Sequence, residues 1–168
     1  ESMQLRTSVL NTLFKALDHR HVNVHLLSIE HLQDRTMGVY DTTTFENIRN
    51  KLKSLHLKIA VEWNEYGPDG DMENPEKHDF FKQDLNTHWL EPLQSQLTHL
   101  SLYAGDFWGV YPRWDPRKLH FPRLKFLSIG MWSLAHTWQV EWLLSHSNSL
   151  EELNLENCPI AHALCFDN

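Results

Sequence analysis

The side chains best suited to chemistry in this chain are its twelve histidines, and His19, His21 and His25 form their densest group. Imidazole nitrogens bind zinc, but zinc sites usually add paired cysteines or an H-E-x-x-H motif, and neither accompanies this group. Surface histidines without a metal are therefore the favoured interpretation.

Carboxylates offer a second possible metal site, because Asp69, Asp71 and Glu73 alternate along a stretch rich in Gly, Pro and Asn. Such oxygens can bind calcium, but Gly70 is misplaced for an EF-hand loop, and no glutamate stands at the offset of its last ligand. We predict a solvated acidic loop here.

Motifs for covalent catalysis are missing from the sequence. It contains no G-x-S-x-G, no Gly-rich phosphate loop and no coherent Ser/His/Asp spacing. Cys158 stands in a repeat position where packing is a more natural function than nucleophilic attack. We expect a protein that is not an enzyme and that needs no metal and no cofactor.

Composition limits the partners and the compartment. The net charge is −7 over 168 residues without a run of Lys or Arg, so nucleic acid is not an expected partner. Two cysteines suit a reducing compartment, and neither a bilayer-spanning apolar run nor a signal peptide is seen. We expect one domain over residues 3–168, with no membrane partner and an intracellular location, cytoplasmic or nuclear.

Five segments with apolar residues at relative positions 1, 4 and 6 supply the framework for any site. They begin at Val24, Leu52, Leu97, Leu124 and Leu150, in steps of 28, 45, 27 and 26 residues. This period is typical of leucine-rich repeats. We predict an α/β leucine-rich repeat solenoid of about five repeats, with parallel strands near 24–30, 52–58, 97–103, 124–130 and 150–156 on its concave face.

The segments between these strands must cross over on the convex side. An apolar stripe from Leu5 to Leu17 predicts a helix, and Thr43 and Glu46 have capping-box spacing for a second one. The long step predicts an inserted loop and helix at 63–96, and residues 106–123 predict an irregular crossover. Four tryptophans at helical or strand-end spacing are expected in the core: Trp63, Trp89, Trp138 and Trp142.

The segments HWLEPLQSQLTHLSLY, HFPRLKFLSIG and WQVEWLLSHSNSLEELNLENCPI, within residues 88–160, resemble the leucine-rich repeat region of filamentous-fungal F-box proteins. In that family an N-terminal F-box docks onto the adaptor of a cullin-RING ubiquitin ligase, while the repeats recruit the substrate. The resemblance implies a substrate receptor. Residues 3–18 read as one amphipathic helix rather than an F-box, so the adaptor would be reached only through a segment that this sequence lacks.

Odd positions between the leucines face away from the core and form the candidate concave binding surface for a protein or peptide ligand. Its members are His56, Lys58, His99, Ser101, Tyr103, Phe126, Ser128 and Asn154. The fifth-position column is small and polar, and the aromatic side chains beside it could anchor a ligand. An ordinary solvated sheet face is the equally open alternative.

The irregular crossover supplies a second group of candidate partner contacts. Its members are Phe107, Trp108, Tyr111, Arg113 and Trp114. These side chains could line a pocket or could close the core where a regular helix is missing, and we favour the second interpretation.

Repeat arrays need polar caps, yet the C-terminal repeat ends in apolar residues from Cys158 to Phe166. A homodimer through this uncapped end is therefore possible. The alternative to protein recognition is a structural or self-associating repeat module without ligase coupling.

Overall fold

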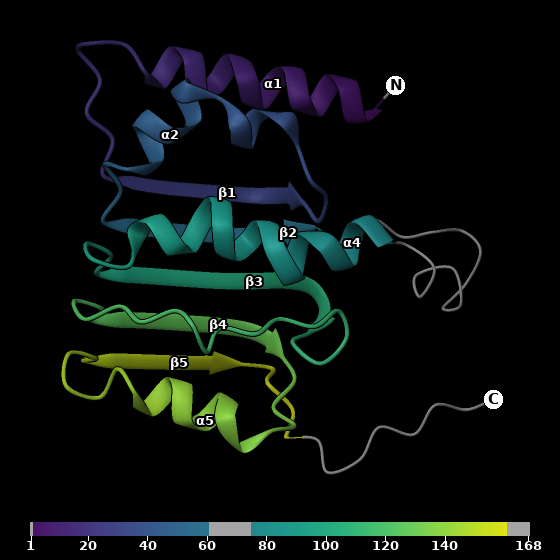
Figure 1. Cartoon of the computed structure of the whole chain (residues 1–168), viewed down its shortest axis with the longest axis vertical. Helices are drawn as coiled ribbons and strands as arrows, with labels where there is room; N and C mark the ends of the chain where they lie inside the picture. The colour runs from purple at the N-terminus through teal and green to yellow at the C-terminus, as the bar shows by residue number, and fades with distance from the viewer. Residues whose placement is uncertain (1, 61–74, 161–168) are drawn as a thin grey trace.

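Five parallel strands, hydrogen-bonded in the order in which they follow one another in the chain, form one open sheet. The computed structural model describes residues 2–60 and 75–160. Figure 1 shows the strands stacked along the long axis of the molecule. They are β1 (Leu26–Gln33), β2 (Ser54–Ala60), β3 (His99–Trp108), β4 (Phe126–Trp132) and β5 (Glu152–Glu156). The mixed α/β class and the parallel sheet are as expected from the sequence.

Each strand begins two residues later than the leucine spacing predicts. The first apolar residue of a unit packs into the core from the turn before the strand, and Leu52, Leu97 and Leu124 are fully buried in this way. Apolar spacing reports which side chains are buried, not where the backbone becomes extended, and this explains the shift.

The helices cover the side of the sheet on which the leucines lie. They are α1 (Ser2–Leu17), η1 (Gly38–Asp41), α2 (Thr43–Arg49), α4 (Pro75–Asp79), the π-helix η2 (Phe80–Leu90), η3 (Glu91–Leu93) and α5 (Thr137–Leu144). Helices α1 and α2 lie at the β1 end of the sheet and α5 at the β5 end (Figure 1). Thr42, rather than Thr43, caps α2, since its hydroxyl accepts a hydrogen bond of 3.3 Å from the Phe45 amide. The connection from β3 to β4 contains no helix, as the sequence predicts.

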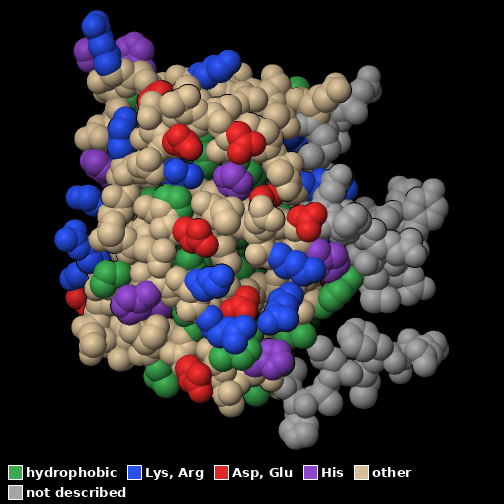
Figure 2. All heavy atoms as spheres, viewed as in Figure 1, with side chains coloured by type: hydrophobic (Ala, Val, Ile, Leu, Met, Phe, Trp, Pro, Cys, Tyr) green, Lys and Arg blue, Asp and Glu red, His purple; other side chains and the backbone are tan. Residues whose placement is uncertain are grey.

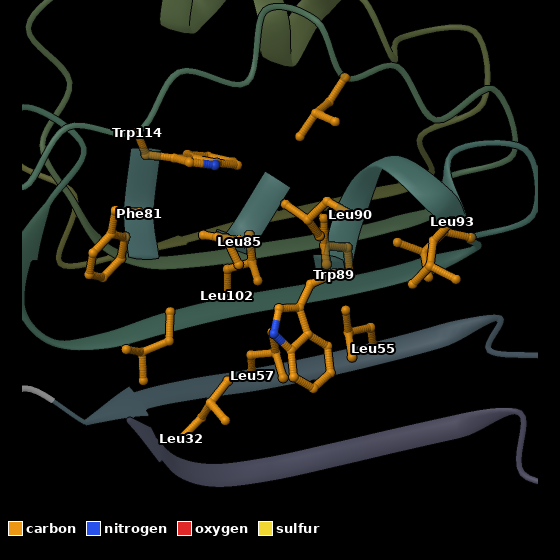
Figure 3. Packing of buried hydrophobic residues seen from close by; sticks show 14 of the residues in the cluster. Leu32, Leu55, Leu57, Phe81, Leu85, Trp89, Leu90, Leu93, Leu102 and Trp114 are labelled. Atoms are coloured by element: carbon orange, nitrogen blue, oxygen red, sulfur yellow. The ribbon is translucent and has the colours of Figure 1, made fainter. Parts of the chain in front are cut away.

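Trp89 joins the helices to the strands. Its indole is fully buried, and Figure 3 shows it between Leu55 and Leu57 of β2. Its ring centroid lies 4.9 Å from that of Phe45 in an edge-to-face contact, a favoured aromatic geometry. The prediction that Trp89 belongs to the core is therefore confirmed.

A second aromatic cluster takes the place of the missing helix between β3 and β4. The tryptophan cluster consists of four buried indoles: Trp108, Trp114, Trp132 and Trp142. Their neighbouring ring centroids lie 5.0–6.4 Å apart. The core position predicted for Trp142 is confirmed, whereas Trp138 is only half buried, under the Arg117 guanidinium. Trp63 lies outside the described residues.

Three of the five strands reach the same unusual backbone conformation. His31, Met131 and Asn157 have φ angles of 60°, 63° and 51°, and each is the eighth residue of its unit. Such angles are uncommon for residues other than glycine, so a shared position indicates a shared turn. The residue after this turn points back into the core in units one and four, as Leu32 and Trp132.

Counting nine residues from the first leucine of each unit does not identify the residues that pair at the ends of the strands. Ile59, not Ala60, pairs with Leu32, because β1 has a bulge at His31. Trp108, not Gly105, pairs with Trp132, because β3 carries three extra residues after Tyr103. Fixed counting fails wherever one strand has extra residues at its end.

Lys, Arg, Asp and Glu side chains are interspersed on the surface seen in Figure 2, with hydrophobic side chains in small separate patches. In the parts of the chain that the structure describes, no helix combines the length and the apolar character needed to cross a membrane.

Candidate functional site

The side of the sheet opposite the helices, here called the open face, carries the third, fifth and seventh positions of each repeat unit in three rows across the strands. The first row runs Leu26, Ser54, His99, Phe126 and Glu152; the second Ser28, His56, Ser101, Ser128 and Asn154; the third Glu30, Lys58, Tyr103, Gly130 and Glu156. All eight predicted concave-face residues therefore lie on this one surface.

A depression of about 550 Å³ occupies the open face. The short side chains of Ser28 and Ser101 and the imidazole of His56 form its floor. Because these residues are small or partly buried, the floor lies below the longer side chains around it. The rim is formed by Glu30, Lys58, Tyr103, Met131, Glu156 and Asn157.

Tyr103 closes one side of the depression by lying toward β4. Its hydroxyl is 2.8 Å from the Ser128 Oγ, and its ring occupies the space that a side chain on Gly130 would take. Ser128 is consequently only 3% exposed. The predicted direct contact between Ser128 and a partner is therefore wrong, because Tyr103 covers this hydroxyl; Ser128 holds Tyr103 in place instead.

Aromatic and imidazole side chains meet at the end of the open face where the strands begin. The His99 ring is stacked on Phe126, with centroids 6.0 Å apart and an interplanar angle of 29°. Burial, reinforced by the positive field of His99 when that ring is protonated, lowers the pKa of His56. Since the ordinary histidine value is about 6.5, His56 is neutral at pH 7 and presents a hydrogen-bonding ring rather than a charge.

Charges of both signs line the opposite end of the face. Lys58 is exposed and stands in register between Glu30 on β1 and Tyr103 on β3. Glu156 lies at the far end of the same row, and burial raises the pKa of the Tyr103 phenol, which stays protonated. Asn154 is exposed on β5, at the edge of the sheet. This row can therefore pair with charged groups of either sign on a ligand.

The structure buries two of the five predicted loop residues and leaves three at the surface. Trp108 and Trp114 are at most 1% exposed, and their indole N–H groups donate to the Gly130 carbonyl and to Asn86 Oδ1, both at 2.8 Å. They cannot touch a partner, so the core interpretation is correct for both. The reason is that the crossover lacks a helix, and only large side chains can fill the space.

Three loop candidates remain at the surface. Phe107 is 48% exposed and Tyr111 40% exposed. The Tyr111 hydroxyl is 2.9 Å from His78 Nε2, and Arg113 lies 3.5 Å from Asp115. None of the three lines the depression on the open face, although Phe107 lines a neighbouring hollow together with Met131 and Asn157 of its rim.

Met131 and Asn157 line the depression although the leucine spacing does not point to them. Each is the eighth residue of its unit and has a positive φ angle. This conformation turns its side chain toward the open face at the end of the strand. Their common position in the repeat is a signal that could have identified them.

Metal ligands do not come together in the residues that the structure describes, since no group of three or more His, Cys, Asp or Glu side chains is close enough. His19 and His21 have ring centroids 5.4 Å apart, and the Arg20 guanidinium donates to His21 Nε2. Asp69, Asp71 and Glu73 lie outside the described residues. Cys158 packs with its Sγ 3.4 Å from the Ile129 carbonyl, and burial raises its thiol pKa, which disfavours the reactive thiolate.

Comparison with known proteins found no match: no family model, no curated protein and no solved structure matches the chain.

Proposed function

We propose that this chain is a leucine-rich repeat solenoid that recognises another protein through the open face of its sheet. The repeated unit supports the solenoid: the strands follow at the spacing of the leucines, in register, and units one, four and five share a left-handed eighth residue. Parallel strands in chain order with helices behind them are the arrangement that such repeats adopt.

The observation that carries the binding function is the depression of about 550 Å³ on the open face. It combines a low floor of serines with a tyrosine at its side and charges of both signs on its rim, Glu30, Lys58 and Glu156. A short extended segment of a protein fits such a surface, because backbone groups can reach the serines while side chains meet the rim. Interfaces are generally organised around aromatic anchors of this kind with a polar surround.

The F-box resemblance supports a more specific version, in which the bound protein is a substrate presented to a cullin-RING ubiquitin ligase. This version rests on the segments at residues 88–160 and on no feature of the open face. Affinity capture with the natural full-length protein tests it, since adaptor and cullin subunits should be recovered together with the repeats. Their absence would contradict the ligase version and leave the binding surface as proposed.

Peptide selection tests the open face directly. A random peptide library is selected on the immobilised chain, and an enriched peptide is then titrated against Ser101→Trp, which fills the floor of the depression. Ser95→Trp is the matched control, because Ser95 is exposed in the turn after η3, among the crossovers. We expect Ser101→Trp to weaken binding about tenfold or more and Ser95→Trp to leave it within about twofold. Equal binding by both variants, or no enriched peptide at all, would contradict the proposal.

A further inference from the structure

The edge strand β5 exposes side chains that are buried in every inner strand. Leu153 and Leu155 are 44% and 37% exposed, although their register partners on β4, Leu127 and Ile129, are fully buried. Within the described part of the chain, β5 has a neighbouring strand on one side only. Its apolar side chains therefore extend the core to an open end.

The outer side of the β5 backbone has no neighbouring strand among the residues that the structure describes. The Glu152 amide donates to the Lys125 carbonyl of the preceding unit at 2.9 Å. Successive residues of a parallel strand direct their peptide groups to opposite neighbours. The N–H and C=O groups of Leu153 and Leu155 therefore point away from β4, where an additional strand could bond to them.

Charge determines what kind of strand fits. Residues 133–160 contain Glu141, Glu151, Glu152 and Glu156 and neither Lys nor Arg. Glu151 is paired with Lys125 at 2.7 Å, but Glu152 and Glu156 are exposed at the two ends of β5. A partner strand with Lys or Arg at the two adjacent positions would place a cation beside each carboxylate.

The chain itself shows such a pairing at the other end of the sheet. Glu30 on β1 stands directly beside Lys58 on β2, and apolar residues occupy the positions before them on the core side. Opposite charges at neighbouring positions stabilise strand pairs, whereas like charges destabilise them. The β2 sequence SLHLKIA thus shows what a strand next to an acidic edge looks like.

The same rule disfavours a second copy of this chain. An antiparallel two-fold pairing of β5 strands centred on Asn154 would place Glu152 opposite Glu156. A parallel continuation in the register of the sheet would place Glu156 beside Glu30 of the next copy. Either arrangement brings two carboxylates together.

We propose that the outer edge of β5 is a second binding site, which takes a parallel β-strand of a partner protein with apolar residues beside Leu153 and Leu155 and basic residues beside Glu152 and Glu156. This site shares Glu156 with the rim of the depression on the open face, but Glu152 and the outward peptide groups of β5 lie outside that depression. The comparison of Leu155→Pro with Leu155→Ala therefore tests the edge separately from the open face.

Fluorescence anisotropy with labelled synthetic peptides tests the proposal. The probe is KLHLKIA, which follows residues 54–60 with lysine at the place of Ser54, and the control is ELHLEIA. We expect the basic peptide to bind at least about tenfold more tightly than the acidic one and to weaken as salt is added. The double substitution Glu152→Lys and Glu156→Lys should reverse this preference.

Backbone pairing is tested by comparing Leu155→Pro with Leu155→Ala. Both remove the side chain, but only proline removes the outward amide, and it leaves the bonds to β4 in place because those come from the neighbouring residues. We expect the proline variant to bind KLHLKIA about tenfold more weakly than the alanine variant, with the circular dichroism spectrum unchanged. Should the proline variant unfold, Glu152→Lys alone still decides, because Glu152 does not line the depression on the open face.

Three results would overturn the proposal: equal binding of both peptides, a double lysine variant that keeps the original preference, or a folded proline variant that binds like the alanine variant. Sedimentation adds a fourth. A concentration-dependent dimer of the chain that Leu155→Pro abolishes would show that the occupant of this edge is a second copy.

Discussion

The ring of Tyr103 packs against the backbone of Gly130 on the adjacent strand, in the place where every other strand of the third row has a side chain. A methyl group on Gly130 would overlap the ring, so the two residues depend on each other. Tyr103 can form this wall of the depression on the open face because Gly130, its neighbour in the third row, has no side chain.

Gly130→Ala is expected to destabilise the protein by about 1–3 kcal/mol, because the ring must leave its position and its bond to Ser128. In the Tyr103→Ala background the same substitution should cost less than about 0.5 kcal/mol, since the overlap is gone. Urea denaturation of the four proteins measures the coupling. Additive effects would show that the ring does not rest on this glycine.

Phe107 near the end of β3 and Trp114 in the crossover that follows it should respond differently to truncation. Trp114→Ala removes a fully buried indole from the tryptophan cluster and is expected to lower the free energy of unfolding by about 3–5 kcal/mol. Phe107→Ala removes a side chain that is 48% exposed and should cost less than about 1 kcal/mol. Similar losses for the two variants would argue against the burial described for Trp114.

The stability of the fold is expected to fall with acidification because of His146. Its ring is 1% exposed, its Nε2 accepts from the Phe121 amide at 3.2 Å, and its Nδ1 is 3.0 Å from the Trp142 carbonyl. Burial, with a smaller effect of the stacked His120, lowers its pKa below the ordinary value. The unfolded chain therefore binds more protons, and stability is lost as the pH falls below about 6.5.

Urea denaturation between pH 7.5 and pH 5 measures this loss. His146→Gln should flatten the pH dependence, because a glutamine oxygen can still accept from Phe121 without titrating. The exposed His21→Gln is the control and should follow the wild type. An unchanged slope in the His146 variant would assign the effect to other groups.

Gln139 holds the start of α5 with three hydrogen bonds. Its Oε1 accepts from the Ala135 and His136 amides at 2.8 and 2.9 Å, and its Nε2 donates to the Ser133 carbonyl at 2.8 Å. Gln139→Glu keeps the acceptor but replaces the donor with a second oxygen facing that carbonyl. We expect a loss of about 1–3 kcal/mol, since the side chain is fully buried. Glu141→Gln, exposed on the same helix, should be near neutral in thermal unfolding.

Leucine spacing alone predicts the parallel strands, their neighbours and the rows of the open face, because a period of two within each segment determines which side chains share a side. The same information does not predict the conformation of Tyr103, and with it the burial of Ser128. Glycine at the seventh position of unit four, beside tyrosine in unit three, is the local signal that was available. It becomes informative only when two strands are considered together.

Burial of Trp108 and Trp114 could not be derived from periodicity, because Trp108 follows three extra residues in β3 and Trp114 lies in an irregular segment. Their burial follows from a shortage of volume where a crossover lacks a helix, a property of the assembled layers. The π-helix η2 is unpredictable for a related reason, since apolar spacing is nearly the same for α- and π-helical turns over so short a segment.

In the part of the chain that the structure describes, each strand pairs only with those next to it in the sequence, and the two ends of its sheet are connected through the strands between them. Chains with this connectivity can lose their terminal units while the middle stays folded. Amide exchange should therefore be fastest in β1 and β5 and slowest in β3. Unfolding becomes a directional process, in which strands separate from both ends of the sheet and the middle, where Trp89 packs, unfolds last.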